Sequence, residues 1–428
     1  MNLEELHRLF VTSTGVCTDT RTIKPGQLFF ALKGPTFDAN DFALEAIEKG
    51  ALWSVVALDC TIDHPQLIRV ADPLETLQDL ARHHRNTFDI PVIALTGSNG
   101  KTTTKELISA VLNKRYQTLT TKGNLNNHIG VPLTLLGLDA TYEVAVIEMG
   151  ANHQREIASL AAIAMPTHGL ITNFGKAHLE GFGGIQGVIK GKQELYGHLK
   201  AHKGTIFFNE NDPIQVEALA TYSNKVPYQV AVPGSTSGTH VVEILQESPQ
   251  LALRYQGLHC SSPLFGAYNA TNIAAALAIG DFFEVPLSMA TQAIADYQPE
   301  NMRSEVREIN GYKIFLDAYN ANPSSMESAI RLFDTFEWKN KALILGDMFE
   351  LGESAQEEHQ KIINLLHALS FDTVYLIGAN FAQTSTHYQK FRTTEAFLEQ
   401  FPLQLKTSNL MIKGSRGMAL ERVLNKLS

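Results

Sequence analysis

The stretch PVIALTGSNGKTTTK, residues 91–105, decides the fold class of this chain. It opens with apolar residues that show no polar alternation, which is typical of a central strand in a parallel sheet. A glycine-containing loop follows, and an amphipathic helix is predicted over residues 105–113. A buried strand, a glycine loop and a helix in that order indicate an α/β unit with a ligand at the loop.

The loop has the residue types that bind a nucleoside triphosphate. Gly97 and Gly100 let backbone N–H groups curl around phosphate oxygens, and the helix N-terminus adds the positive end of its dipole. We expect Lys101 to reach the β- and γ-phosphates and the Thr102 hydroxyl to hold Mg²⁺. The usual pattern has a further glycine where this chain has Leu95, so the loop is the shorter G-x-x-G-K-T-T form. A plain strand-to-helix turn with solvated lysines is the alternative.

Composition narrows the class of protein. The 428 residues are 44% hydrophobic and 18% charged, which is ordinary for a folded protein and excludes a mostly disordered chain. A formal net charge of -9 argues against a nucleic-acid binder, which needs a basic face. Cys17, Cys60 and Cys260 lie far apart without CxxC spacing, which excludes a disulfide scaffold and a cysteine zinc site and fits a reducing compartment.

Neither a signal peptide nor a membrane span is predicted. The opening MNLEELHRLF is acidic and lacks a long apolar core. The longest uncharged stretch, residues 263–280, contains Asn and Thr residues and is predicted to be a buried helix with its lead-in. We therefore expect a cytoplasmic, wholly folded protein.

Two polar stretches divide the chain into three α/β units. HHRNTFD (residues 83–89) and YQPENMRSE (residues 297–305) are predicted linkers, which places domains at 1–87, 88–298 and 299–428. The first unit has predicted strands at 28–32 and 53–57, a helix at 41–49 and a helix that opens at Asp72-Pro73. The second adds strands at 143–150 and 168–175, shorter strands within 228–255 and a helix from Asn269. The third alternates strands at 313–317, 341–346, 372–378 and 409–414 with helices at 324–336 and 355–369, which is a doubly wound pattern.

Four further residues are considered for chemistry. Glu148 ends an apolar run, where a carboxylate is costly to bury without a cation, so we expect it to bind Mg²⁺; the alternative is a strand-end turn cap. His178 follows the next strand and can bind a metal or orient a carboxylate, although a lone histidine is more often structural. Lys190 and Lys192 begin a helical stretch, where solvated lysines are the plain interpretation.

At this point the chain resembles a family. TGSNGKTTTK, GNLNNHIGVPLTLL, EMGANH, NFGKAHLEGFGG, YNATNIAAALAIG, LDAYNANPSSM, LGDMFELG and KGSRGMALE occur in the order found in Mur ligases, the ATP-dependent amide ligases of peptidoglycan precursor synthesis. DAYNANPSSM and GDMFELGE are most similar to the branch that joins D-alanyl-D-alanine to UDP-N-acetylmuramoyl-tripeptide. The resemblance covers nearly the whole chain.

The resemblance implies a small α/β UDP-substrate domain, a central P-loop-type ATP-binding domain with a parallel sheet, and a C-terminal Rossmann-like domain. The family often has Gly-His where this chain has Ala39-Asn40, so a contact from Asn40 to the uridine side stays open. For the run from Thr18 to Arg21 the alternative is a polar turn. The substrate-binding positions in the first domain are Thr18, Asp19, Thr20, Arg21, Lys33, Gly34, Phe37 and Asp38.

The resemblance also assigns the remaining site. It implies that Lys192 rather than Lys190 is carbamylated and helps to hold a second Mg²⁺, which His178 would share, because a carbamate is a carboxylate-like ligand. The implied ATP contacts are Gly97, Ser98, Asn99, Gly100, Lys101, Thr102, Thr103, Asn269, Asn272, Arg303 and Asp317. The implied peptide contacts are Asn124, Asn126, Asn127, Asn320, Asn322, Lys413, Ser415 and Arg416, with turn chemistry and a solvated helix start as alternatives.

The implied reaction needs ATP because a free carboxylate does not acylate an amine at neutral pH. Transfer of the γ-phosphate would make an acyl phosphate, which the amine of D-alanyl-D-alanine then attacks. We expect a monomer. A Mur ligase that adds a single amino acid and a folylpolyglutamate synthetase are the alternatives among enzymes, and the first-domain TDTR and LKG runs count against the folate enzyme. A nucleotide-regulated binding protein is the alternative from another class.

Overall fold

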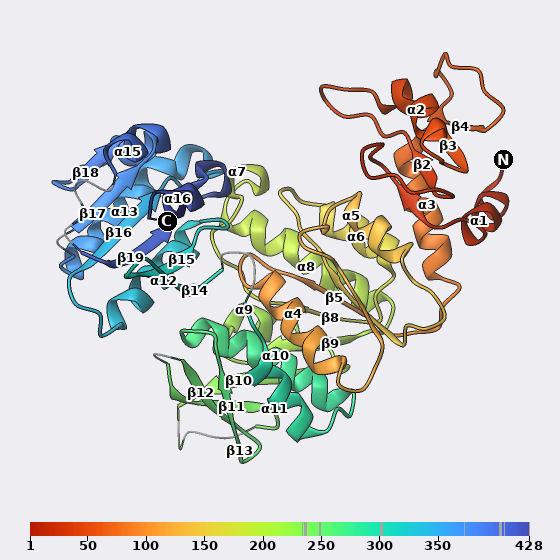
Figure 1. Ribbon diagram of the computed structural model, residues 1–428. Helices are drawn as coiled ribbons and strands as arrows, with labels where there is room; N and C mark the ends of the chain where they lie inside the picture. Colours follow the sequence, from red (N-terminus) through yellow and green to blue (C-terminus); the bar gives the residue numbers. More distant parts are fainter. Residues whose placement is uncertain are drawn as a thin grey trace.

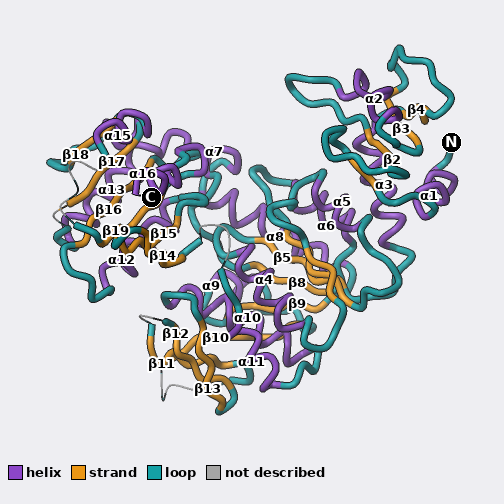
Figure 2. The backbone as a smooth tube through the Cα atoms, in the orientation of Figure 1, coloured by secondary structure: helices purple, strands orange, loops and turns teal. Residues whose placement is uncertain are grey.

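The computed structural model describes residues 1–232, 234, 238–247, 250–299, 303–371, 373–401, 405 and 407–427. These residues form three separate sheets of four, nine and six strands, in chain order. Figures 1 and 2 show three bodies, with the first and the last at opposite ends of the central one. The three-domain α/β architecture predicted from the sequence is confirmed.

The first body is a parallel sheet, in the order β1-β2-β3-β4, with its helices packed against it. Asp72 caps the helix predicted to open there, because its carboxylate accepts hydrogen bonds from the N–H groups of Leu74 and Glu75. The elements are α1 (Leu3–Val11), β1 (Val16–Cys17), β2 (Leu28–Phe30), α2 (Ala43–Glu48), β3 (Trp53–Ala57), β4 (Leu67–Val70) and α3 (Pro73–Arg85).

Helix α3 extends into the stretch predicted as the first linker. Arg85 is buried at its last turn and donates to the carbonyl oxygens of Phe88, Ile90 and Ala164. Ala164 ends a helix of the central body, so the connection is packed rather than solvated. The polar stretch HHRNTFD therefore contains a buried arginine, whose hydrogen bonds join the two bodies.

The central body is a doubly wound sheet in the order β13-β12-β11-β10-β9-β8-β5-β7-β6. Alternate residues of β5 face opposite cores, with Ile93 and Leu95 in one and Val92 and Ala94 in the other, which explains its unbroken apolar run. Among the described residues of this sheet, the pairs β11–β12 and β12–β13 are the antiparallel ones. The elements are β5 (Val92–Thr96), α4 (Lys101–Leu112), β6 (Thr118–Thr120), α5 (Gly130–Leu135), β7 (Val144–Glu148), α6 (Glu156–Ala164), β8 (His168–Ile171), α7 (Leu179–Phe182), α8 (Ile185–Ala201), β9 (Thr205–Asn209), α9 (Pro213–Ala218), β10 (Lys225–Ala231), β11 (Val241–Gln246), β12 (Leu251–Tyr255), β13 (Leu258–Ser262), α10 (Ala267–Phe282) and α11 (Leu287–Asp296).

The third body has the strand order β14-β15-β19-β16-β17-β18; in the part of it that the structure describes, β14 is antiparallel to its neighbour and the other pairs are parallel. The predicted alternation is confirmed, whereas the short strand β14 was not predicted. Residues 300–302 of the second predicted linker and Asp372, which begins a predicted strand, lie outside the described residues. The elements are β14 (Glu305–Ile309), β15 (Tyr312–Asp317), α12 (Pro323–Thr335), β16 (Lys341–Gly346), α13 (Ala355–Ala368), β17 (Thr373–Ile377), α14 (Ala379–Ala382), β18 (Gln389–Phe391), α15 (Thr394–Gln400), β19 (Asn409–Lys413) and α16 (Leu424–Leu427).

The carboxyl ends of strands from the central and third sheets border one cavity. Loops after β5, β7 and β8 line it from the central body, and loops after β15, β16 and β19 line it from the third. Parallel sheets place ligands at this edge, so the topology positions the site between the two bodies. None of the described helices combines the length and apolar character that a membrane crossing requires.

Candidate active site

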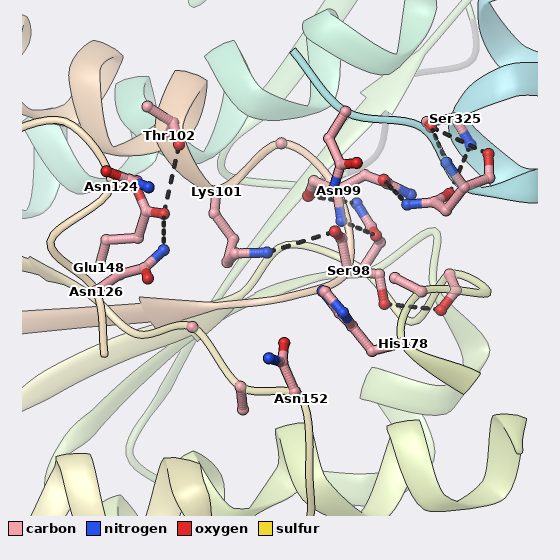
Figure 3. Close-up of a pocket in the computed structure, with 18 of the residues that line it drawn as sticks. Ser98, Asn99, Lys101, Thr102, Asn124, Asn126, Glu148, Asn152, His178 and Ser325 are labelled. Atoms are coloured by element: carbon pink, nitrogen blue, oxygen red, sulfur yellow. Dashed lines mark hydrogen bonds between the residues drawn. The ribbon is translucent and has the colours of Figure 1, made fainter. Parts of the chain in front are cut away.

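One cavity of about 1280 Å³ collects most of the predicted site residues. Figure 3 shows Lys101, Glu148 and His178 around this space. From the central body its lining includes Ser98, Asn99, Gly100, Lys101, Thr102, Thr103, Asn124, Asn126, Asn127, Glu148, His178, Asn269 and Asn272. From the third body and the segment that leads into it, the lining includes Arg303, Asp317, Asn320, Asn322, Lys413, Ser415 and Arg416.

The phosphate-loop glycines have backbone conformations that favour glycine, and neighbouring atoms leave no room for a side chain at either position. A Cβ on Gly97, whose φ is 149°, would lie 1.9 Å from the Thr172 hydroxyl oxygen. Gly100 has φ 79° at the N-cap of α4, and a Cβ there would lie 2.7 Å from Asn272 Oδ1. The Lys101 ammonium donates to the Gly97 carbonyl oxygen at 2.8 Å, on the inner side of the loop. Helix α4 therefore begins at Lys101, earlier than the predicted residue 105.

Asn99 is the loop residue that both bodies hold. Its N–H donates to Asn173 Oδ1 at 3.0 Å, and its carbonyl oxygen accepts from the Thr172 hydroxyl at 2.6 Å. Asn322 of the third body, which also caps α12, donates to Asn99 Oδ1 at 2.7 Å. The loop geometry is thus coupled to the position of the third domain.

Glu148 is buried at the end of β7 with one oxygen satisfied and one not. Its Oε1 accepts from Asn126 Nδ2 at 2.7 Å and from the Thr102 hydroxyl at 3.4 Å. Its Oε2 is buried without a hydrogen-bond partner. The Glu148 carboxylate and the Thr102 hydroxyl lie side by side at the cavity wall and are hard oxygen ligands, so the residues present fit a magnesium site.

The two lysines of the predicted chemistry lie in unlike surroundings. Lys101 lines the cavity; burial lowers its pKa, the Glu148 carboxylate opposes that shift and Arg303 adds to it. Lys192 does not line the cavity, is only 1% exposed and has its ammonium 5.0 Å from the centre of the Phe182 ring. Burial and the charge of Lys101 lower the pKa of Lys192 well below its ordinary value.

His178 faces the third body. It stands at the N-cap of α7 with φ 53°, and its Nδ1 pairs with Glu350 in the loop after β16. The hydrogen bond from His178 lowers the pKa of Glu350, although burial raises it. Within the part of the chain that the structure describes, no three His, Cys, Asp or Glu side chains are grouped to hold a metal ion.

The third-body wall is a network centred on Asp317. Its carboxylate pairs with the Lys413 ammonium and accepts from the N–H of Ser304 at 3.1 Å. Lys413 also donates to the carbonyl oxygen of Asn320 at 3.2 Å. Arg303 lies over the ring of Tyr319, with its guanidinium carbon 3.7 Å from the ring centre, and presents a cation to the cavity.

Asn269 and Asn272 at the start of α10 form a hydrogen-bonded ladder with the phosphate helix. Asn272 Oδ1 accepts from the Thr104 hydroxyl at 3.1 Å, and Asn272 Nδ2 donates to Asn269 Oδ1 at 3.0 Å. Both side chains are buried, so their amides are oriented before any ligand arrives.

The predicted first-domain contacts lie apart from the cavity, since none of them lines it. Arg21 donates to Asp19 and lowers the pKa of that carboxyl to about 2, and Lys33 pairs with Asp38 at 3.2 Å. The Asn40 side chain donates to Asp38 Oδ1 at 2.7 Å and accepts from the N–H of Ala57 at 2.9 Å, so the fold fixes its orientation. We call the predicted substrate-binding positions of the first domain the first-domain face. Its residues are Thr18, Asp19, Thr20, Arg21, Lys33, Gly34, Phe37 and Asp38.

Sequence reasoning missed several residues of the cavity region. Gln78 on α3 lines the cavity, as does Arg155 at the start of α6. Tyr319 also lines it, and a tyrosine inside the DAYNANP run is a sequence signal that could have found it. Lys105 is buried behind Glu148; its place four residues after Lys101 on an apolar helix was the available signal.

The chain is similar to known proteins over most of its length. Residues 95–280 match the Mur ligase middle domain, and residues 302–408 match the Mur ligase glutamate ligase domain. A UDP-N-acetylmuramoyl-tripeptide–D-alanyl-D-alanine ligase from Bacillus subtilis is 34% identical over 96% of this chain and 93% of its own length.

Solved structures are similar over the same extent. MurF from Acinetobacter baumannii superposes with a TM-score of 0.86 at 29% identity, covering 98% of this chain and 97% of that one. MurF from Thermotoga maritima in complex with ADP gives a TM-score of 0.85 at 26% identity, with 98% and 97% covered. By sequence over its full length and by fold, this chain belongs to the Mur ligase family, in its MurF branch.

Proposed function

We propose that this enzyme joins D-alanyl-D-alanine to UDP-N-acetylmuramoyl-tripeptide with ATP, in the synthesis of peptidoglycan precursors. The observation that carries the proposal is one cavity lined both by the phosphate loop at Lys101 and by the third-body group at Lys413 and Arg416. A ligase needs such a place, because the phosphate donor, the carboxylate and the amine must meet there. The relatives that share the full chain length are named for this activity.

The chemistry begins with activation of a carboxylate. The terminal carboxylate of the UDP-linked peptide attacks the γ-phosphorus of ATP, ADP leaves, and an acyl phosphate forms. The amine of D-alanyl-D-alanine then attacks the acyl carbon, and inorganic phosphate leaves as the amide bond forms. Phosphoryl transfer depends mainly on positioning and charge stabilisation. Loop N–H groups, the N-terminus of α4, Lys101 and Arg303 supply both.

Thr102 and Glu148 are the residues that would hold Mg²⁺, as the position of the Thr102 hydroxyl beside Glu148 Oε1 supports. When bound, the ion neutralises charge on the phosphate oxygens. Asn126 keeps the Glu148 carboxylate turned toward Thr102 through its hydrogen bond to Oε1. The chain thus prepares the ligand geometry before ATP arrives.

We assign the second magnesium to His178 and a carbamylated Lys192. A lysine whose pKa is lowered by burial has a larger neutral fraction, and the neutral amine is the nucleophile that attacks CO₂. The new N–C bond forms as the nitrogen loses a proton, which gives a carbamate and H⁺. For this role Lys192 must turn from the Ala151 carbonyl, 3.4 Å from its Nζ, toward the cavity that Ala151 lines.

We further assign domain boundaries at 87/88 and 298/299 and the UDP end of the substrate to the first-domain face. The peptide would extend past Gln78 and along Asn124, Asn126 and Asn127 toward Lys101. The third domain covers the reacting end, which keeps water from the acyl phosphate. We also propose a monomer, and three free buried cysteines fit the reducing cytoplasm.

A substrate-panel assay tests the proposal. Purified enzyme with ATP and Mg²⁺ should release phosphate only when both UDP-N-acetylmuramoyl-tripeptide and D-alanyl-D-alanine are present. Single amino acids in place of the dipeptide, and a folate in place of the UDP substrate, should give background release. Equal release without an amine acceptor would indicate a nucleotide-regulated binding protein instead.

A further inference from the structure

Lys105 is a buried lysine that the proposed chemistry does not use. It lies on α4, one turn after Lys101, and its side chain is 2% exposed. Its ammonium donates hydrogen bonds to the carbonyl oxygens of Thr121 at 2.9 Å and Gly123 at 3.2 Å. A buried ammonium is costly unless acceptors surround it, so this lysine has a specific set of partners and is not part of a solvated face.

The same ammonium faces the free oxygen of Glu148. Lys105 Nζ lies 3.9 Å from Glu148 Oε2, the buried carboxylate oxygen that has no hydrogen-bond partner. The other oxygen, Oε1, is the one directed at Asn126 and Thr102. Lys105 therefore stands behind the carboxylate, on the side away from the proposed magnesium ligand pair.

The backbone contacts of Lys105 lead to the loop that carries the cavity asparagines. Thr121 is itself tied to β7, because its hydroxyl accepts from the N–H of Glu148 at 3.0 Å. Further along the loop, the carbonyl oxygen of Asn126 accepts from the N–H of Gly150 at 2.8 Å. Lys105 on helix α4 therefore contacts both residues 121–127 and Glu148 at the end of β7, and that loop and β7 also contact each other.

We propose that Lys105 is a positioning residue, which orients the Glu148 carboxylate for Mg²⁺ and holds residues 121–127 so that Asn124 and Asn126 face the cavity. The inference rests on the proposed function in one respect, since it takes Glu148 as the ligand of the magnesium that accompanies ATP. Groups that orient a metal ligand from behind change metal affinity by roughly 10–100-fold when they are removed.

The test compares Lys105→Met with Lys122→Met, a control that removes an exposed lysine from the same loop. Mn²⁺ binding in the presence of ADP is measured from the electron paramagnetic resonance signal of the free ion. Hydrogen exchange of residues 118–130 is measured separately in the metal-free protein. We expect Lys105→Met to weaken Mn²⁺ binding about 10–100-fold and to speed exchange in the loop, and Lys122→Met to match the wild type.

A folded Lys105→Met protein with Mn²⁺ affinity within about twofold of wild type and unchanged loop exchange would overturn the proposal. If that variant does not fold, Lys105→Gln takes its place. The amide keeps donors for the two carbonyl oxygens and loses only the charge that faces Glu148, so Mn²⁺ affinity alone is then decisive, and a value within about twofold of wild type would overturn the orienting role. Absence of Mn²⁺ binding by the wild type with ADP would count against the proposed function. The exchange measurement, made without metal, would then decide the role of Lys105 by itself.

Discussion

The cavity and the first-domain face differ in how firmly their side chains are held. In the cavity, Glu148 and Asn272 are buried and bonded to neighbours from other elements before substrate binds. On the first-domain face, the Arg21 side chain is 85% exposed and pairs with Asp19 two residues away. Chemistry needs groups fixed in a water-poor space, whereas recognition of a distant part of the substrate can use an open surface. Changes in the cavity should therefore lower kcat, and changes on the face should raise KM.

Lys101→Ala is expected to give the largest effect. The substitution removes the ammonium group that is proposed to contact the γ-phosphate. Because the site is buried, the attraction between these charges is strong, so turnover should fall by about 10²–10³-fold or more. Binding of UDP-N-acetylmuramoyl-tripeptide should persist, because its proposed anchor is the first-domain face. Phosphate release and calorimetric titration with that substrate measure the two quantities. Simultaneous loss of UDP-substrate binding would show that the two regions are not separate in function.

Lys192→Ala tests a buried residue that lies behind the cavity lining. The variant should lose most of its activity, and formate or acetate should restore part of it, because a small carboxylate can occupy the space of the proposed carbamate. Lys190→Ala, two residues earlier on α8, is the matched control and should behave as wild type. Full activity of Lys192→Ala without any added carboxylate would remove the carbamate from the mechanism.

The local parts of this site were predictable from sequence, and the parts made by docking were not. Gly97, Gly100 and Lys101 were found because a phosphate loop has a local signature of small residues between a strand and a helix. The bond from Asn322 to Asn99 joins residues that are distant in sequence, and no local pattern indicates it.

Buried polar residues were the other source of error. The sequence placed Arg85 in a polar linker and indicated no role for Lys105, since long cationic side chains are mostly exposed in folded proteins. Each is buried among backbone carbonyl oxygens that the fold supplies from elsewhere. Strand β14 was missed for a related reason, because an edge strand with an exposed middle lacks a clear apolar pattern.

Phe37→Ala tests the first-domain face directly. Its ring is 56% exposed and offers a flat surface on which a base can stack. We expect KM for the UDP substrate to rise about tenfold with kcat unchanged, in line with the contribution of base–aromatic stacking. Phe42→Ala removes another exposed ring of the same domain and should leave KM unaltered. A fall in kcat for Phe37→Ala would contradict the division of labour between the two regions.

The ion pairs that dock the third domain should give the smallest effect and a pH dependence. Lys176, from the loop after β8, pairs with Glu358 on α13 at 2.8 Å. Burial raises the pKa of Glu358, but the hydrogen bonds from Lys176 and Lys361 together lower it by more. The net shift of the pKa is therefore downward. A carboxyl group whose pKa is lowered by docking stabilises the docked state fully at pH values above its ordinary pKa. That stabilisation is lost as the pH falls through the lowered pKa. Docking should therefore weaken in acid.

Glu358→Gln imitates the protonated state at neutral pH. Because the Lys176 side chain is 41% exposed, the pair contributes about 1 kcal/mol or less, which is at most about fivefold in the equilibrium between docked and undocked third domain. Small-angle scattering, or the distance between labels on α6 and α13, should report a modest opening. Glu357→Gln is the control, since Glu357 pairs with Lys361 on its own helix and not with the central domain. If Glu358→Gln opens no more than Glu357→Gln, the docked position depends on Asn322, His178 and the apolar contacts rather than on the pair between Lys176 and Glu358.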